Sequence, residues 1–257
     1  MRSVTWGMYF VCALFFLFLI FEAGYRFGDR KQNEVSSEQR SEVGTLLGAL
    51  LALFGFLLAF SFGIAEARFE ERKATVLREA NAIGTTFLRS DFLTEPQRTK
   101  ARQLIRDYVR LRLDAIHESN TVAAIKKSGE IHASLWSLAR TMSNKFSRSV
   151  PVGLFVTSLN EVIDLHEERI TVALSYRLPP SLIWALFLVC FFSTIALGFS
   201  SGLTGKRNVF MIVPLTFSFA AVLFLMIDLD QIRPHFFTIT QNPMEDVLHS
   251  IELSLGS

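Results

Sequence analysis

The segment from Gly44 to Leu93 constrains the fold most, because an apolar span runs there into a charged amphipathic helix with no proline between them. Its first part, Gly44–Ala65, contains no Asp, Glu, Lys or Arg. At about 1.5 Å per residue, a helix of this length crosses a hydrocarbon core of roughly 30 Å. We therefore expect a membrane protein in which one span continues outward as a rigid helical stalk.

Three other windows are uncharged and long enough to cross a bilayer: Val4–Phe21, Leu182–Ser201 and Val209–Ile227. Half of the residues are hydrophobic, yet 19% are charged, which leaves material for a soluble part. The predicted organisation is therefore spans one and two, a helical domain continuous with span two, spans three and four, and a C-terminal tail, with the bounds 1–65, 66–181, 182–227 and 228–257.

The segment between spans two and three reads as helical throughout. Apolar residues recur there at helical spacing, as in Val76, Ala80 and Ile83, and Thr94 with Pro96 is typical of a helix start. No window alternates at period two for long enough to indicate a strand. The predicted fold class is all-α: four transmembrane helices with a helical bundle inserted between spans two and three.

Composition and motifs exclude several classes of function. The net charge of +2, without basic runs interleaved with aromatic residues, argues against nucleic-acid binding. The two cysteines, Cys12 and Cys190, lie inside predicted spans, so no disulfide framework is expected. Phosphate-binding, zinc-hydrolase and nucleophile-elbow motifs are missing, and we expect no enzyme.

The second span carries a stripe of small residues on one helix face, at spacings of three and four: Gly44, Gly48, Ala52, Gly55, Ala59 and Gly63. Small residues let helices approach closely. One interpretation is packing against another span of the same chain. The other is that this helix surrounds the central axis of a homo-oligomer, with Phe54, Leu57 and Ser61 on a different face as pore-lining residues that gate by dewetting.

Two acidic residues follow the fourth span directly. Asp228 and Asp230 lie where a helix C-terminus is already partly negative, so they need a partner. The partner is either an interfacial arginine, with capping of the next turn, or a divalent cation such as Ca²⁺ completed by Gln231 and backbone carbonyls. The candidate arginines are Arg26, Arg68 and Arg233.

Gly84 interrupts the charged half of the long helix, at a cost of about 1 kcal/mol relative to alanine. Such a residue suggests close contact with another helix or a local break. Asn81, one turn earlier, either hydrogen-bonds across this packing joint or faces an aqueous pathway at the neck of a pore.

Several motifs resemble those of the bestrophin-like membrane proteins, a bacterial family. The first block is Arg78–Thr85, followed by Leu88-Arg89 and Glu95-Pro96, and the closing motifs are Ile227–Asp230 and Gln241–Met244. The run His235-Phe236-Phe237 departs from the family, in which a small residue follows the proline. The resemblance implies kinship of architecture with the bestrophin anion channels, whose second span enters a helical cytosolic domain and whose subunits form a pentamer. It also implies that Asp228 and Asp230 fall where bestrophins hold calcium, although the longer acidic run of those channels is absent here.

These observations predict a multi-pass protein of the bacterial inner membrane that assembles with copies of itself, as a pentamer by resemblance, and conducts ions. The alternative is a non-conducting membrane sensor or scaffold. Basic residues in the short loops favour a periplasmic helical domain, whereas those near the ends of the insert favour a cytoplasmic one. Taken with the resemblance, we expect the cytoplasmic orientation.

Overall fold

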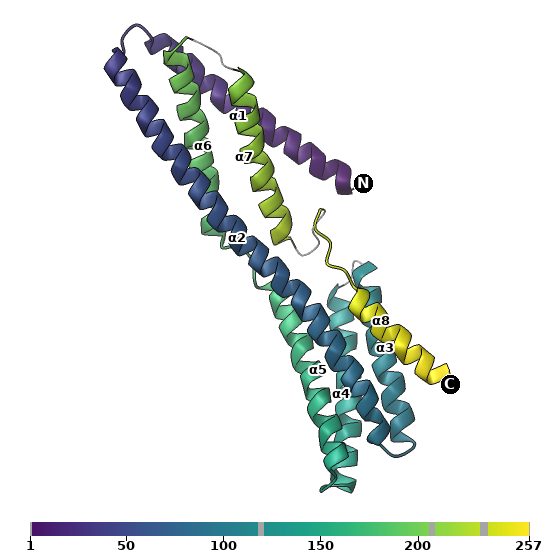
Figure 1. The fold of residues 1–257 in the computed structure, drawn as a ribbon. Coiled ribbons are helices and arrows are strands. Elements are labelled where there is room, and N and C mark those ends of the chain that lie inside the picture. The colour runs from purple at the N-terminus through teal and green to yellow at the C-terminus, as the bar shows by residue number, and fades with distance from the viewer. Residues whose placement is uncertain (1, 118–120, 206–208, 232–235, 257) are drawn as a thin grey trace. The chain divides into compact units, whose positions relative to one another are not determined.

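The computed structural model describes residues 2–117, 121–205, 209–231 and 236–256, and these residues contain helices and no strand (Figure 1). The α-helices are α1 Arg2–Lys31, α2 Ser37–Arg89, α3 Gln97–His117, α4 Thr121–Lys145, α5 Val150–Leu174, α6 Pro180–Leu203, α7 Val209–Asp230 and α8 Asn242–Gly256. A short 3₁₀ turn, Ser90–Phe92, follows α2. The all-α prediction is confirmed.

Four helices are long and apolar enough to cross a membrane, as predicted: α1, α2, α6 and α7. Helix α2 has 53 residues and no proline, so no residue removes a backbone hydrogen bond and the span continues into the charged segment. The chain divides into two compact units. The membrane unit comprises Met1–Phe69 and Arg177–Thr238, and the helical unit comprises Glu70–Tyr176 and Ile239–Ser257.

The closest helix pair in the membrane unit is α1 with α6. Its contact is made by four residues that we call the glycine seam: Gly24, Gly28, Gly198 and Gly202. A Cβ atom built on any of them would lie within 3.0 Å of a backbone oxygen of the facing helix. Two backbones can approach this closely only where side chains are absent, and the approach maximises dispersion contacts in lipid.

The rest of the membrane unit packs through larger side chains. Phe54 of α2, Leu186 of α6 and Met226 of α7 are all buried in one apolar cluster. Rings join α1 to α7, where the centroid of Trp6 lies 4.9 Å from that of Phe224 and the two rings are tilted by 46°. The cluster fixes which face of α2 points into the unit.

The helical unit is a bundle built from the C-terminal part of α2 together with α3, α4, α5 and α8. The stripe Val76, Ala80 and Ile83 is buried in its core, as the helical spacing predicts. Ser149 caps α5 by accepting the backbone N–H of Val152 at 3.5 Å, and a proline occupies the first turn.

Helix α8 was not anticipated, since the segment 228–257 was expected to be a tail. Met244 and Ile251 are buried against the bundle, with Val247 and Leu248 packed beside them. This i, i+3, i+4, i+7 spacing is the signal of an amphipathic helix. The helix lies along α3 (Figure 1), and Arg110 pairs with Glu252 at 2.5 Å. The tail is therefore shared: residues up to Thr238 belong to the membrane unit and the remainder to the helical unit.

Candidate functional site

One face of the membrane half of α2 points into the membrane unit. Phe54 and Ser61 are completely buried on this face. The Phe54 ring packs 4.7 Å from that of Phe219 on α7, and the Ser61 hydroxyl donates to the Leu57 carbonyl at 2.7 Å. Leu57 is half-buried. This burial argues against the pore-lining role expected for Phe54 and Ser61. The sequence did not indicate which face of this span is buried, because a span that is apolar on all sides shows no hydrophobic periodicity.

The other side of α2 is uncovered, and we call it the open face. It consists of the small residues Gly44, Gly48, Ala52, Ala59 and Gly63 and the large residues Leu46, Leu53, Phe56 and Phe60. Among the described residues, a Cβ atom at Gly44, Gly48 or Gly63, or at the half-buried Gly55 beside them, would meet nothing within 4 Å. Phe56 is 69% exposed and Phe60 58%. Within the described part of the chain, the glycines of the small-residue stripe therefore make no close contact with another span.

Two further candidates of the sequence lie in the helical unit. Asn81 is exposed on α2. A Cβ atom at Gly84 would lie 3.9 Å from a methyl carbon of Val247, an ordinary van der Waals contact with α8. Helix α2 is unbroken at Gly84, and the neighbour on α8 leaves room for a Cβ atom, so the role of Gly84 as a close packing joint stays a prediction.

Asp228 and Asp230 are buried at the end of α7 and accept hydrogen bonds from backbone amides. The Phe236 N–H donates to Asp228 Oδ2 at 2.9 Å, and the Leu178 N–H donates to Asp230 Oδ1 at 2.8 Å. Each carboxylate thereby fixes a segment that enters or leaves a membrane helix. The contact at Asp228 holds the backbone at Phe236, which lies outside any helix of the described residues, so the expected capping of the next turn stays a prediction.

The arginines proposed as partners have other contacts. Arg26 pairs with Glu22 at 2.9 Å, and Arg68 donates to the carbonyl of Arg177. Arg233 lies outside the described residues. Calcium takes six to eight oxygen ligands, whereas no group of three or more His, Cys, Asp or Glu that could hold a metal occurs in the described part of the chain. One oxygen of each aspartate is held by a backbone amide, so a calcium ion here would depend on Gln231 and backbone carbonyls for most of its ligands, and this site stays a prediction.

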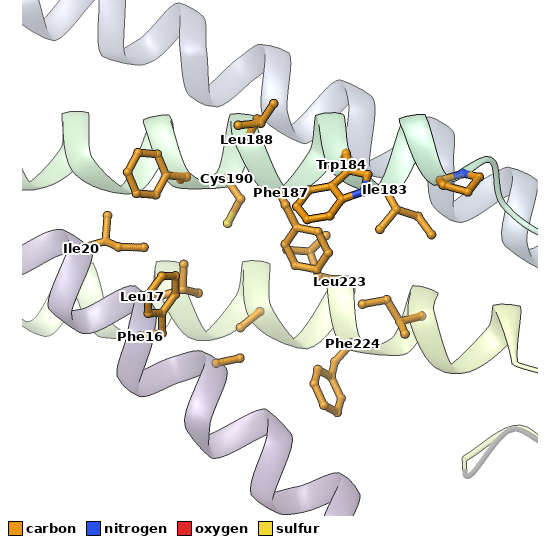
Figure 2. A pocket seen from close by; sticks show the side chains of 15 residues that line it. Phe16, Leu17, Ile20, Ile183, Trp184, Phe187, Leu188, Cys190, Leu223 and Phe224 are labelled. Carbon is orange, nitrogen blue, oxygen red and sulfur yellow. The ribbon is translucent and has the colours of Figure 1, made fainter.

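An apolar cavity of about 750 Å³ lies between α1, α6 and α7 (Figure 2). Phe16, Trp184, Phe187 and Phe224 line it, and Cys190 is the one lining residue with a thiol. Binding sites for polar ligands need a few placed hydrogen-bonding groups besides apolar walls. This cavity offers hydrocarbon surface and no catalytic constellation.

The core of the helical unit contains a buried ion cluster formed by Glu79 of α2, Arg112 of α3 and Arg169 of α5. Glu79 is fully buried. Its Oε2 lies 2.5 Å from Arg169 Nη1, and its Oε1 lies 3.2 Å from Arg112 Nε. Arg169 also donates to the side-chain oxygen of Gln241 at 3.1 Å, which ties the segment before α8 to the cluster.

Aromatic donors complete this polar core. The Tyr108 hydroxyl donates to Glu79 Oε1 at 2.5 Å and lies 3.0 Å from His166 Nδ1, while the His132 ring packs 4.7 Å from that of Tyr108. Burial, together with the negative charge of Glu79, raises the pKa of Tyr108 well above its ordinary value, so the phenol stays a donor. Burial and the neighbouring His166 lower the pKa of His132 to about 4. His132 is therefore neutral at pH 7.

Sequence reasoning did not single out Glu79, although it lies inside the Arg78–Thr85 block. The available signal was its position three residues after Val76 and four before Ile83, on the apolar stripe of the helix. A carboxylate at such a position needs buried cationic partners. Which arginines supply them depends on tertiary packing.

With this geometry in place, the comparisons with known proteins decide the family. The model of the Bestrophin-like domain matches residues 4–232. The chain belongs to the Bestrophin-like family. The matched range of this Bestrophin-like chain includes Glu79 and the open face of α2. Helix α8 lies outside the matched range.

Solved structures give the same fold. Two structures of single-residue variants of a bacterial bestrophin homolog from Klebsiella pneumoniae match over nearly the whole chain. The first has 14% sequence identity and a TM-score of 0.66, covering 95% of this chain and 96% of that one. The second has 12% identity and a TM-score of 0.64, covering 96% and 99%. No curated protein sequence matches the chain.

Proposed function

We propose that this Bestrophin-like protein is a homo-oligomeric ion channel in which the open face of α2 surrounds the central axis. The observation that carries the proposal is the contrast within one span. Phe54 and Ser61 are fully buried on one side, while the small-residue stripe meets nothing within 4 Å among the described residues on the other. Small residues in a span support close approach of another helix. A second copy of α2 is the helix that symmetry supplies.

The large side chains of the open face suggest the constriction. Leu53, Phe56 and Phe60 are each about half exposed or more, and they recur at three and four residues along the helix. Repeated by symmetry, they would form successive apolar rings around the axis. Narrow rings of this kind exclude water and so gate conduction.

Family membership supports the proposal, because the sequence resembles the bestrophin anion channels in the order of its spans and in the continuation of span two into a helical domain. From that resemblance we take the pentamer, the bacterial inner membrane and the cytoplasmic orientation of the helical unit. The likeness to the Klebsiella pneumoniae homolog supports the fold alone.

Single-channel recording in planar bilayers tests the proposal. Replacing Phe56 or Phe60 with alanine removes an apolar ring, widens the constriction and should raise the conductance several-fold. Phe15→Ala is the matched control, because this α1 side chain is 63% exposed on a different span. Its conductance should equal that of the parent.

Silence of the parent and of both ring variants would contradict conduction, provided that oligomers in the bilayer are verified and a wide range of voltage and calcium is sampled. The protein would then be a non-conducting scaffold or sensor. An equal increase in the Phe15 variant would instead show that the constriction is not on α2.

A further inference from the structure

We propose that the core of the helical unit binds a small monovalent anion of halide size, between α3 and α4, beside Arg112, Ser128 and His132. The inference is independent of whether the protein conducts ions. It rests on an unbalanced buried charge and on polar side chains that have no hydrogen-bonding partner.

The charge imbalance comes from the buried ion cluster. The side chains of Arg112 and Arg169 are only 10% and 14% exposed, and both pair with the single carboxylate of Glu79. Among the described residues no second carboxylate pairs with either arginine. A buried charge without compensation costs several kcal/mol, so one guanidinium in excess favours a bound anion.

Two polar groups on α4 point to where the anion lies. Ser128 is fully buried and His132 is 6% exposed. Within the described part of the chain, Ser128 Oγ and His132 Nε2 have no hydrogen-bonding partner. They are four residues apart, so they share one face of the helix. Buried donors are almost always satisfied by protein, water or an ion.

The helix register brings this pair to Arg112. Helices α3 and α4 are antiparallel, because Lys100 lines a groove with Ser137 whereas Leu111 lines another with Lys127. The ring of His132 packs against Tyr108. One turn farther along each helix, Arg112 on α3 is therefore level with Ser128 on α4.

The chemistry of the three groups selects an anion. Arginine offers only donors, a serine hydroxyl can donate, and a neutral imidazole carries one N–H, which an anion beside Nε2 would hold at that nitrogen. His132 is neutral at pH 7, since burial above all lowers its pKa. One halide would balance the excess guanidinium and satisfy both orphan donors.

The test uses the full-length protein in detergent and measures the unfolding midpoint in chloride, bromide and gluconate at one ionic strength. Binding to the folded state alone raises the midpoint. We expect the parent to unfold about 2–4 °C higher in chloride or bromide than in gluconate. The variant Ser128→Ala should lose this difference, while Ser137→Ala, on an exposed position of the same helix, should keep it.

The variant also separates an anion from a water molecule. If water fills the site, Ser128→Ala lowers the midpoint equally in all three salts, and the proposal is overturned. If the site is empty, removing an orphan hydroxyl raises the midpoint in every salt, which overturns it as well. Should the variant not fold, bromide-soaked crystals of the parent decide: an anomalous peak beside Ser128 supports the site, and no peak there contradicts it.

Discussion

Two sets of glycines in the membrane unit have opposite surroundings. In the glycine seam, each missing Cβ leaves room that the backbone of the facing helix occupies. On the open face of α2, a Cβ at Gly44, Gly48 or Gly63 would meet nothing within 4 Å among the described residues. The same residue type therefore has two kinds of surroundings: the seam glycines lie in contacts inside one chain, whereas the open-face glycines lie where we propose that another copy of the chain binds.

The difference follows from what lies opposite each glycine. In the seam, glycines of α1 face glycines and carbonyls of α6, so both backbones are bare at the contact. On α2 the glycines adjoin large exposed side chains such as Phe56 and Phe60. Covering such a face inside a bilayer gives no hydrophobic stabilisation, because lipid tails are as apolar as the side chains. A second helix would bind there only through close van der Waals packing.

The largest expected effect comes from placing leucine in each set. Gly202→Leu pushes a side chain into the α1 backbone, which cannot move without separating the helix pair, so we expect no folded, monodisperse protein. Gly48→Leu should fold normally, because its side chain enters open space, but should fail to assemble. Yield, unfolding midpoint and native mass spectrometry in mild detergent measure both effects. Equal behaviour of the two variants would remove the distinction between seam and open face.

The next effect concerns phenylalanines on opposite sides of α2. Phe54→Ala empties a fully buried site and should cost about 3–5 kcal/mol. Phe56→Ala removes an exposed ring and should leave the stability of the isolated subunit within about 0.5 kcal/mol. Thermal unfolding under dissociating conditions compares them. A destabilising Phe56 variant beside a neutral Phe54 variant would reverse the assignment of the two faces.

A smaller effect is expected from lowering the pH, which should reduce the stability of the helical bundle. The two glycine sets contain no titratable group and should not contribute to it. The pKa of His132 is about 4 in the folded bundle, lowered by burial from 6.5. The unfolded chain therefore binds more protons between these values, and His132 contributes stability that is complete above pH 6.5 and lost as the pH falls through 4. This shift corresponds to a loss of up to about 3 kcal/mol in the free energy of unfolding.

The pH dependence can be read from Trp136 of α4, after Trp6 and Trp184 have been replaced by phenylalanine. The stability of the bundle should decrease from pH 6.5 to 4 in this background, and His132→Gln should flatten the decrease. An unchanged profile in the His132 variant would assign the acid sensitivity to another group of the buried core.

The sequence predicted the spans, the continuous helix from span two and the buried stripes of the bundle, because length and a 3.6-residue period depend on local pattern alone. It did not predict which side of α2 is buried, since a uniformly apolar span has no such period. The motifs Gly24-x-x-x-Gly28 and Gly198-x-x-x-Gly202 are also typical of close helix packing. Close packing was predicted only for the longer stripe on α2. The partners of Glu79 come from three helices and the C-terminal segment, which local pattern cannot bring together.

Disulfide crosslinking between subunits tests the central claim most directly. In a background of Cys12→Ser and Cys190→Ala, Ala52→Cys places one thiol on the open face, and Val11→Cys places one on α1, where Val11 is 63% exposed. Oxidation in native membranes should convert the Ala52 variant into covalent dimers and leave the Val11 variant monomeric. Efficient crosslinking at Val11 with none at Ala52 would contradict the claim that the open face of α2 is where copies of this chain meet.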